Sequence, residues 1–152
     1  MSEYLKYIGV KLIGAKPMTR GDYNAFKGWT IPPDENPNDE GYLVEYSDNY
    51  VSWSPKDTFD EAYRRTDAMS FGLAIEAAKK GNKIARVGWN GKAQYVELAD
   101  AISYKKPDGT VVNIEHEAIG NKALAFVGTS GTQMGWLASQ ADMLADDWQI
   151  VE

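Results

Sequence analysis

The fold of this chain is decided between residues 70 and 90, which read SFGLAIEAAKKGNKIARVGWN. Ser70 is a typical helix N-cap, and Gly81 stands where a helix commonly ends in the left-handed conformation. Between them, four apolar residues recur at the spacing of one helical face: Phe71, Ala74, Ile75 and Ala78. Residues 83–87 then alternate like a strand and lead into a Gly-Trp-Asn-Gly turn at 88–91. This order of elements indicates an α+β domain built on an antiparallel sheet.

The remaining sequence of this second half predicts further strands and one short helix. The expected strands are residues 94–98, 102–105, 110–114, 122–127 and 148–151. An Asp-Gly pair at 108–109 predicts a hairpin, and Ser139 is expected to cap one helical turn. Four apolar side chains are expected in the core: Leu137, Met143, Leu144 and Trp148. The predicted architecture is a curved antiparallel sheet with helices packed on one side.

The first 67 residues predict a separate, small α+β module. The expected elements are a strand at 7–13, a helix from Thr19 to Phe26, a hairpin of residues 42–46 and 50–53, and a helix from Ser54-Pro55 to about Arg65. Residues 31–41 hold three prolines and four acidic residues, which favours a loop. Residues 66–68 are expected to join the two halves. The predicted domains are therefore residues 1–67 and 68–152.

Composition limits the partners of this chain of 152 residues. It contains no cysteine, which excludes disulfides and thiolate zinc sites. Its net charge of −6 argues against nonspecific binding of DNA or RNA, because such binding depends on basic residues that neutralise phosphates. No apolar run approaches the length of a membrane span, and no signal peptide is visible, so we expect a cytoplasmic protein that does not bind a membrane.

The sequence offers few candidates for catalytic residues. The single histidine, His116, lies between Glu115 and Glu117, and this triplet is the one candidate for a metal or acid–base site. We favour a solvated loop or strand edge, since no second histidine supports a metal site. The residues of 128–131 lack the lysine of a phosphate-binding loop and predict a plain turn. The sequence thus predicts no catalytic residue, no metal and no cofactor, although a carboxylate pair from distant aspartates stays open.

Two segments carry signals for ligand binding. Residues 77–96 contain no acidic side chain and five basic ones, among them Arg86 and Lys92. The turn within this segment presents Trp89 and Asn90, and an indole can stack on a base while an amide can read a base edge. The alternative is that Trp89 packs on the sheet.

The second segment is residues 136–148. Ser139 and Asp142 have the spacing of a capping box, with Asp in place of the usual Glu. Gln140 and Asp142 are the polar residues of this segment that we expect to face a ligand, although capping its own helix is a sufficient role for Asp142. The neighbouring Asp146-Asp147 pair is expected to be a solvated face.

Three runs resemble the second type of Thoeris anti-defence protein, a family of small phage proteins: residues 69–74, 84–92 and 136–148. The resemblance covers about residues 68–152. It implies a homotetramer that binds a cyclic ADP-ribose signal made by a TIR-domain protein and does not cleave it. Some members also bind the cyclic oligonucleotide signals of CBASS defence. Carried onto this sequence, the resemblance implies a site of Arg86, Trp89, Asn90, Lys92, Trp136, Ser139, Gln140 and Asp142.

Two other functions remain open at this point. One is a phosphodiesterase that degrades such signals, which would need a centre such as His116 with its two glutamates. The other is a phage interaction protein built around the N-terminal module. Residues 33–46 of that module, followed by residues 53–55, resemble a segment that recurs in phage proteins.

Overall fold

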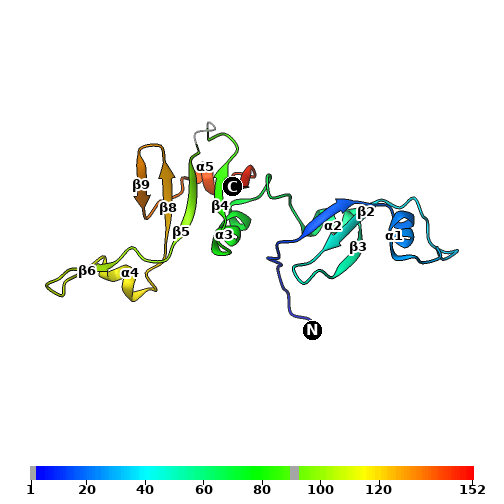
Figure 1. Cartoon of the computed structure of the whole chain (residues 1–152), viewed down its shortest axis with the longest axis horizontal. Coiled ribbons are helices and arrows are strands. Elements are labelled where there is room, and N and C mark those ends of the chain that lie inside the picture. Colours follow the sequence, from blue (N-terminus) through cyan, green and yellow to red (C-terminus); the bar gives the residue numbers. More distant parts are fainter. Residues whose placement is uncertain (1–2, 90–92) are drawn as a thin grey trace. The chain divides into compact units, whose positions relative to one another are not determined.

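The computed structural model describes residues 3–89 and 93–152. The chain divides into two units, Met1–Arg64 and Arg65–Glu152 (Figure 1). Each unit combines an antiparallel sheet with helices, so the predicted α+β class is confirmed. No helix among the described residues is long and apolar enough to cross a membrane.

The second unit is built on an open five-stranded sheet in the order β10-β4-β5-β8-β9. Its strands are β4 (Lys83–Arg86), β5 (Tyr95–Ala99), β8 (Ala123–Gly128), β9 (Gly131–Met134) and β10 (Trp148–Val151). All neighbours are antiparallel, as expected for strands joined by short turns. Strand β9 lies at one edge of the sheet and is exposed along its length, which explains why its sequence, GTQM, gives no apolar alternation.

The core of this unit lies between the centre of the sheet and helix α3 (Phe71–Lys79). Ile84 and Val96 face each other across β4 and β5 and are fully buried. Ala74 and Ala78 of the predicted apolar face of α3 are buried against them, and small side chains there let the helix approach the sheet closely. Trp148 of β10 is also fully buried. The predicted helix, its face and its place in the core are thus confirmed.

The ends of α3 follow the predicted signals. The Ser70 hydroxyl accepts a hydrogen bond from the backbone N–H of Leu73 at 3.3 Å, which satisfies one free donor of the first turn. Gly81 adopts a φ of +96°, a conformation that costs glycine little. Strand β4 can therefore start two residues later and fold back along the helix.

Residues 100–121 differ from the sequence prediction. The two predicted strands shorten to β6 (Tyr104–Lys105) and β7 (Val111–Val112), which form a separate two-stranded sheet. The triplet around His116 lies in a short helix, α4 (Ile114–Ala118), where we had expected a loop or strand edge. Asn121 holds the base of this segment, because its side-chain oxygen accepts hydrogen bonds from the backbone of Ile102 and Ser103.

The first unit has a three-stranded sheet in the order β1-β2-β3. Its elements are β1 (Gly14–Pro17), α1 (Arg20–Lys27), β2 (Gly41–Glu45), β3 (Val51–Pro55) and α2 (Lys56–Ala62). Helix α1 is confirmed, with Thr19 as its N-cap, and so is the β2–β3 hairpin. Tyr42 of β2 stacks on Phe59 of α2 with ring centroids 4.1 Å apart, so α2 covers the face of the sheet that carries Tyr42.

Two boundary predictions in this unit are wrong. The predicted strand at residues 7–13 lies upstream of the observed strand, because β1 pairs with β2 from Gly14 onward. The helix predicted from Ser54 begins at Lys56 and ends at Ala62, because Ser54 and Pro55 complete the pairing of β3 with β2. Pairing within the sheet here overrides the helix-start signal of the Ser-Pro pair.

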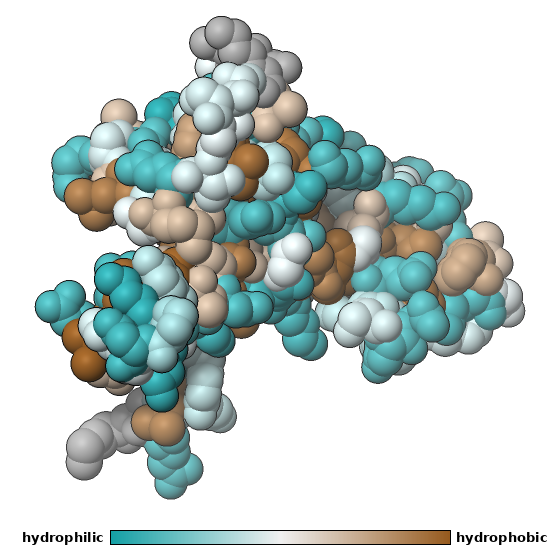
Figure 2. Space-filling view, turned by 60° about the vertical axis from the view of Figure 1, so that its left-hand side comes forward, coloured by the Kyte–Doolittle hydropathy of each residue, from teal (hydrophilic) through white to brown (hydrophobic). Residues whose placement is uncertain are grey.

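Many large apolar side chains lie at the surface of both units. Figure 2 shows apolar side chains scattered among hydrophilic ones on one face of the molecule. Three residues that we had expected in the core are exposed: Leu137 by 88%, Leu144 by 78% and Met143 by 38%. That prediction is wrong because helix α5 (Gln140–Met143) has a single turn and buries none of its residues.

Candidate ligand-binding site

Four aromatic rings meet at one end of the five-stranded sheet. Trp89 contacts Phe126, Trp136 and Trp148, with ring centroids 5.3, 6.0 and 5.3 Å apart. All three contacts are edge-on, the arrangement that the charge distribution of aromatic rings favours. Trp148 is fully buried, whereas Trp89 and Trp136 are only partly buried. The structure thus brings together the two tryptophans predicted for the site and packs them against the buried ring of Trp148.

Backbone hydrogen bonds fix the segments that carry these rings. The Trp89 N–H donates to the carbonyl of Arg86 at 3.1 Å and so forms the turn after β4. The Trp136 N–H donates to the carbonyl of Leu124 at 2.8 Å, which ties the segment after β9 to β8. Both half-buried rings therefore stand on backbone anchored to the sheet, as a site with fixed geometry requires.

Arg86 lies beside this cluster and binds two carboxylates. Its Nε donates to Oδ1 of Asp147 at 2.9 Å, and its terminal nitrogen donates to Oδ1 of Asp142 at 3.1 Å. The register of the sheet explains the first contact, because Arg86 pairs with Trp148, the residue after Asp147. Asp147, which we had expected in a solvated face, instead binds Arg86 of the candidate site. The sequence gives no sign of this contact, because it depends on how β4 and β10 pair.

These contacts shift the protonation of the charged groups in consistent directions. Hydrogen bonds to Asp147 and Asp142 raise the pKa of Arg86, so its charge is fixed. Partial burial acts to raise the pKa of Asp142, but hydrogen bonds from Ser139 and Arg86, together with the charge of Arg86, outweigh it and lower that pKa. Asp142 is therefore an ionised hydrogen-bond acceptor near neutral pH.

Ser139 and Asp142 form the predicted capping box of α5. The Asp142 N–H donates to the Ser139 hydroxyl at 3.1 Å, and the Ser139 N–H donates to the Asp142 carboxylate at 3.3 Å. The backbone carbonyl of Asp142 also accepts a hydrogen bond from the indole nitrogen of Trp148 at 2.8 Å. Asp142 thus contacts the capping residue Ser139, Arg86 and the buried Trp148.

The remaining predicted site residues are Gln140, Asn90 and Lys92. Gln140 is exposed at the first position of α5, and no side-chain hydrogen bond is recorded for it within the described parts of the chain. Asn90 and Lys92 lie outside the described residues. Phe126 was missed by the sequence analysis, because alternation in a strand gives no reason to separate one apolar residue from another.

The alternative centre around His116 lies on α4. Among residues 3–89 and 93–152, no group of three or more His, Cys, Asp or Glu side chains is arranged to hold a metal ion. The Nδ1 atom of His116 is buried and finds no hydrogen-bond partner within the part of the chain that the structure describes.

Comparison with known proteins adds the family. A model described as the Thoeris anti-defense 2-like domain matches residues 69–151, more than half of the chain. The curated protein Thoeris anti-defense 2 of Bacillus phage SP01 is 38% identical over 86 residues, which cover 55% of this chain and 94% of that relative. The matched region contains every predicted site residue, from Arg86 to Asp142. The sequence motifs, the α+β fold and these matches agree, and the chain belongs to the Thoeris anti-defense 2-like family.

Proposed function

We propose that this protein is a phage anti-defence protein that binds the cyclic ADP-ribose signal of a TIR-domain enzyme and sequesters it uncleaved in the cytoplasm of the infected host. Family membership supports an anti-Thoeris role. The observation that carries the binding mode is the pair of half-buried tryptophans, Trp89 and Trp136, beside the ionised Asp142. Cyclic oligonucleotide signals, which share bases, riboses and phosphates with this ligand, are the second ligand class to test.

The tryptophans supply the apolar part of the binding energy. A sequestering protein must hold its ligand at nanomolar concentrations, which corresponds to about −12 kcal/mol. Stacking of an aromatic side chain on a base contributes roughly 1–3 kcal/mol. Both rings stand on anchored backbone, so little of this energy is lost to ordering the site on binding.

The charged residues fit the sugar better than the phosphate. Arg86 with Asp142 and Asp147 carries a local charge of about −1, from one positive and two negative side chains. A phosphate would have to displace one of the two carboxylates to reach the guanidinium. Ribose hydroxyls, in contrast, donate readily to a carboxylate. We therefore assign Asp142 to a ribose and expect Lys92, together with Asn90, to complete the phosphate and base contacts.

Self-association is part of this proposal. Leu137 and Leu144 are 88% and 78% exposed on either side of the capping box. Exposed apolar groups of this kind are commonly covered by a partner, and in a symmetric oligomer the partner is a second copy. We propose that these leucines contribute to a homotetramer contact that also closes the ligand site.

One experiment separates sequestration from degradation. The protein is incubated with a cyclic ADP-ribose isomer, removed by heat denaturation, and the supernatant is analysed by mass spectrometry. Intact ligand recovered in proportion to protein supports sequestration. Linear ADP-ribose in the supernatant would instead establish an enzyme, and His116→Ala would then be the first variant to assay. Ligand left free before denaturation would refute binding altogether.

A further inference from the structure

Residues 5–13 lie outside any helix or strand and run into β1 (Figure 1). Large apolar side chains along this segment are exposed to solvent. Five of these side chains are between 45% and 93% exposed: Leu5, Tyr7, Ile8, Val10 and Leu12. Within the described parts of the chain, no backbone hydrogen bond joins residues 5–12 to another segment. A contiguous apolar segment with open backbone groups is a typical template for pairing with another strand.

The chain cannot supply this partner strand from its own hairpin. Pairing of β1 with β2 starts where Gly14 faces Glu45, and the hairpin then turns, with the Tyr46 N–H donating to the carbonyl of Tyr50 at 2.9 Å. The ammonium of Lys11 lies 4.9 Å from the ring centre of Tyr46, which stands at the start of the hairpin turn. Residues 5–10 precede this contact and lie outside the sheet.

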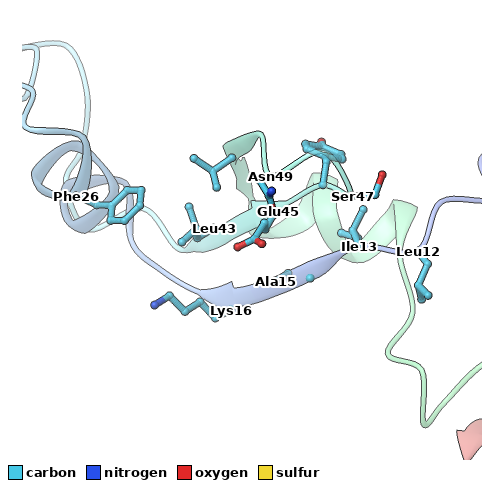
Figure 3. A pocket seen from close by; sticks show the side chains of 12 residues that line it. Leu12, Ile13, Ala15, Lys16, Phe26, Leu43, Glu45, Ser47 and Asn49 are labelled. Atoms are coloured by element: carbon cyan, nitrogen blue, oxygen red, sulfur yellow. The ribbon is translucent and has the colours of Figure 1, made fainter.

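The segment continues an apolar surface that is already present. Beside it, the sheet face opposite α2 forms a groove of about 660 Å³, lined by Leu43, Val51, Phe26 and others (Figure 3). Gly14 and Glu45 are directly paired, so a strand that continued backward from Gly14 would place Ile8, Val10 and Leu12 on the same face as this groove. The sequence thus keeps the pattern of a strand through residues that have no strand partner.

We propose that residues 5–13 pair with the same residues of a second copy of this chain, in antiparallel orientation and about a two-fold axis at Gly9. This pairing joins two three-stranded sheets edge to edge through one continuous ladder. Each segment gives the other the backbone partners that its own hairpin lacks. Ile8 and Val10 of one copy face Val10 and Ile8 of the other, and their apolar surface extends both grooves.

The charges of the segment fit this self-pairing. Lys6 and Lys11 are an odd number of residues apart, so a strand puts them on opposite faces. Any register that matches apolar face to apolar face therefore keeps Lys6 of one copy away from Lys11 of the other. With the axis at Gly9, Lys11 faces Tyr7 of the second copy, a pairing of a cation with an aromatic ring. A Cβ added at Gly9 meets no atom within 4 Å.

The absence of cysteine makes a direct test possible. In Gly9→Cys, the pairing puts two thiols opposite each other on the axis, at a separation that a disulfide can span. We expect diamide to convert this variant to a covalent dimer. Thiols held in paired strands have effective concentrations on the order of millimolar, so cross-linking at about 10 μM protein should be roughly a hundredfold faster than by collision.

Two controls fix the interpretation. Thr58→Cys carries an exposed thiol on α2 of the same unit and measures the collision rate. Gly9→Cys/Val10→Pro keeps the thiol in the same exposed segment but removes a backbone donor, so its rate should fall to that of Thr58→Cys. Equal rates for Gly9→Cys and either control would overturn the proposal. Equal rates would also leave the assembly proposed for the second unit intact, because its leucines are not altered in these variants.

Discussion

The guanidinium of Arg86 and the carboxylate of Asp142 lie 3.1 Å apart and belong to segments 56 residues apart in the sequence. Their side chains are 27% and 17% exposed, so the pair is partly shielded from water. Asp142 is at the same time the last member of the capping box of α5. One carboxylate thus links the end of β4 to helix α5, which lies between β9 and β10 in the sequence, and its loss should lower stability.

The capping box predicts a measurable cost of losing Ser139. Ser139→Ala removes the acceptor of the Asp142 N–H and should lower the free energy of unfolding by about 1 kcal/mol, the usual effect of an N-cap substitution. Urea unfolding followed by tryptophan fluorescence measures this. Thr19→Ala removes the N-cap of α1 in the first unit. It is the matched control, because it measures the stability that another N-cap of this protein contributes. A Ser139→Ala protein as stable as the parent would show that α5 is held without its cap.

The lowered pKa of Asp142 predicts how stability depends on pH. Because its carboxyl ionises at a lower pH in the folded than in the unfolded chain, its contribution is fully present above the unfolded pKa, near 3.8. That contribution is lost as pH falls through the lower pKa of the folded state. Urea unfolding between pH 6 and pH 2.5 should therefore show a smaller acid loss in Asp142→Asn than in the parent. Identical slopes in the two proteins would mean that Arg86 does not favour the ionised form.

The exposed leucines predict a variant that separates assembly from folding. Leu137→Lys/Leu144→Lys should yield smaller particles in sedimentation at micromolar concentration, because charged side chains disfavour an apolar contact. The unfolding transition of the subunit should change little, since both side chains are exposed in the single chain. Ile119→Lys, another exposed apolar position in the same unit, is the control for added charge. A double variant with the parent's sedimentation coefficient would remove the leucines from the contact.

Local signals were the reliable part of the sequence analysis. Capping residues, turn residues and the spacing of apolar residues predicted α3, α5 and most of the strands. Each of these signals depends on residues only a few positions apart in the sequence. These local signals did not predict which side chains near α5 are buried. A helix of one turn offers too little surface to cover Leu137 or Leu144. The binding of Arg86 to Asp147 depends on strand pairing across 61 residues, which local pattern does not encode.

The aromatic cluster shows the same division between local and distant signals. Trp89 and Trp136 were recognised as site candidates from their segments alone. That both rest on Trp148 follows only once β10 lies beside β4. The packing role considered for Trp89 is confirmed by these ring contacts, and its ligand role is a prediction that the packing does not contradict, because the ring is only partly buried.

The two roles of Trp89 can be separated by comparing it with a tryptophan of the other unit. Trp89→Ala should weaken binding of a cyclic ADP-ribose isomer about ten- to hundredfold in calorimetry, the loss of roughly 1–3 kcal/mol of stacking. Trp53→Ala should leave that affinity unchanged, because Trp53 donates to the carbonyl of Met18 at 2.7 Å and packs under Arg20 within the first unit. Trp89→Phe keeps an aromatic ring and should recover most of the affinity if stacking is the cause. If Trp53→Ala loses the ligand while a folded Trp89→Ala retains it, the site lies in the first unit, and the groove beside β1 becomes the place to search.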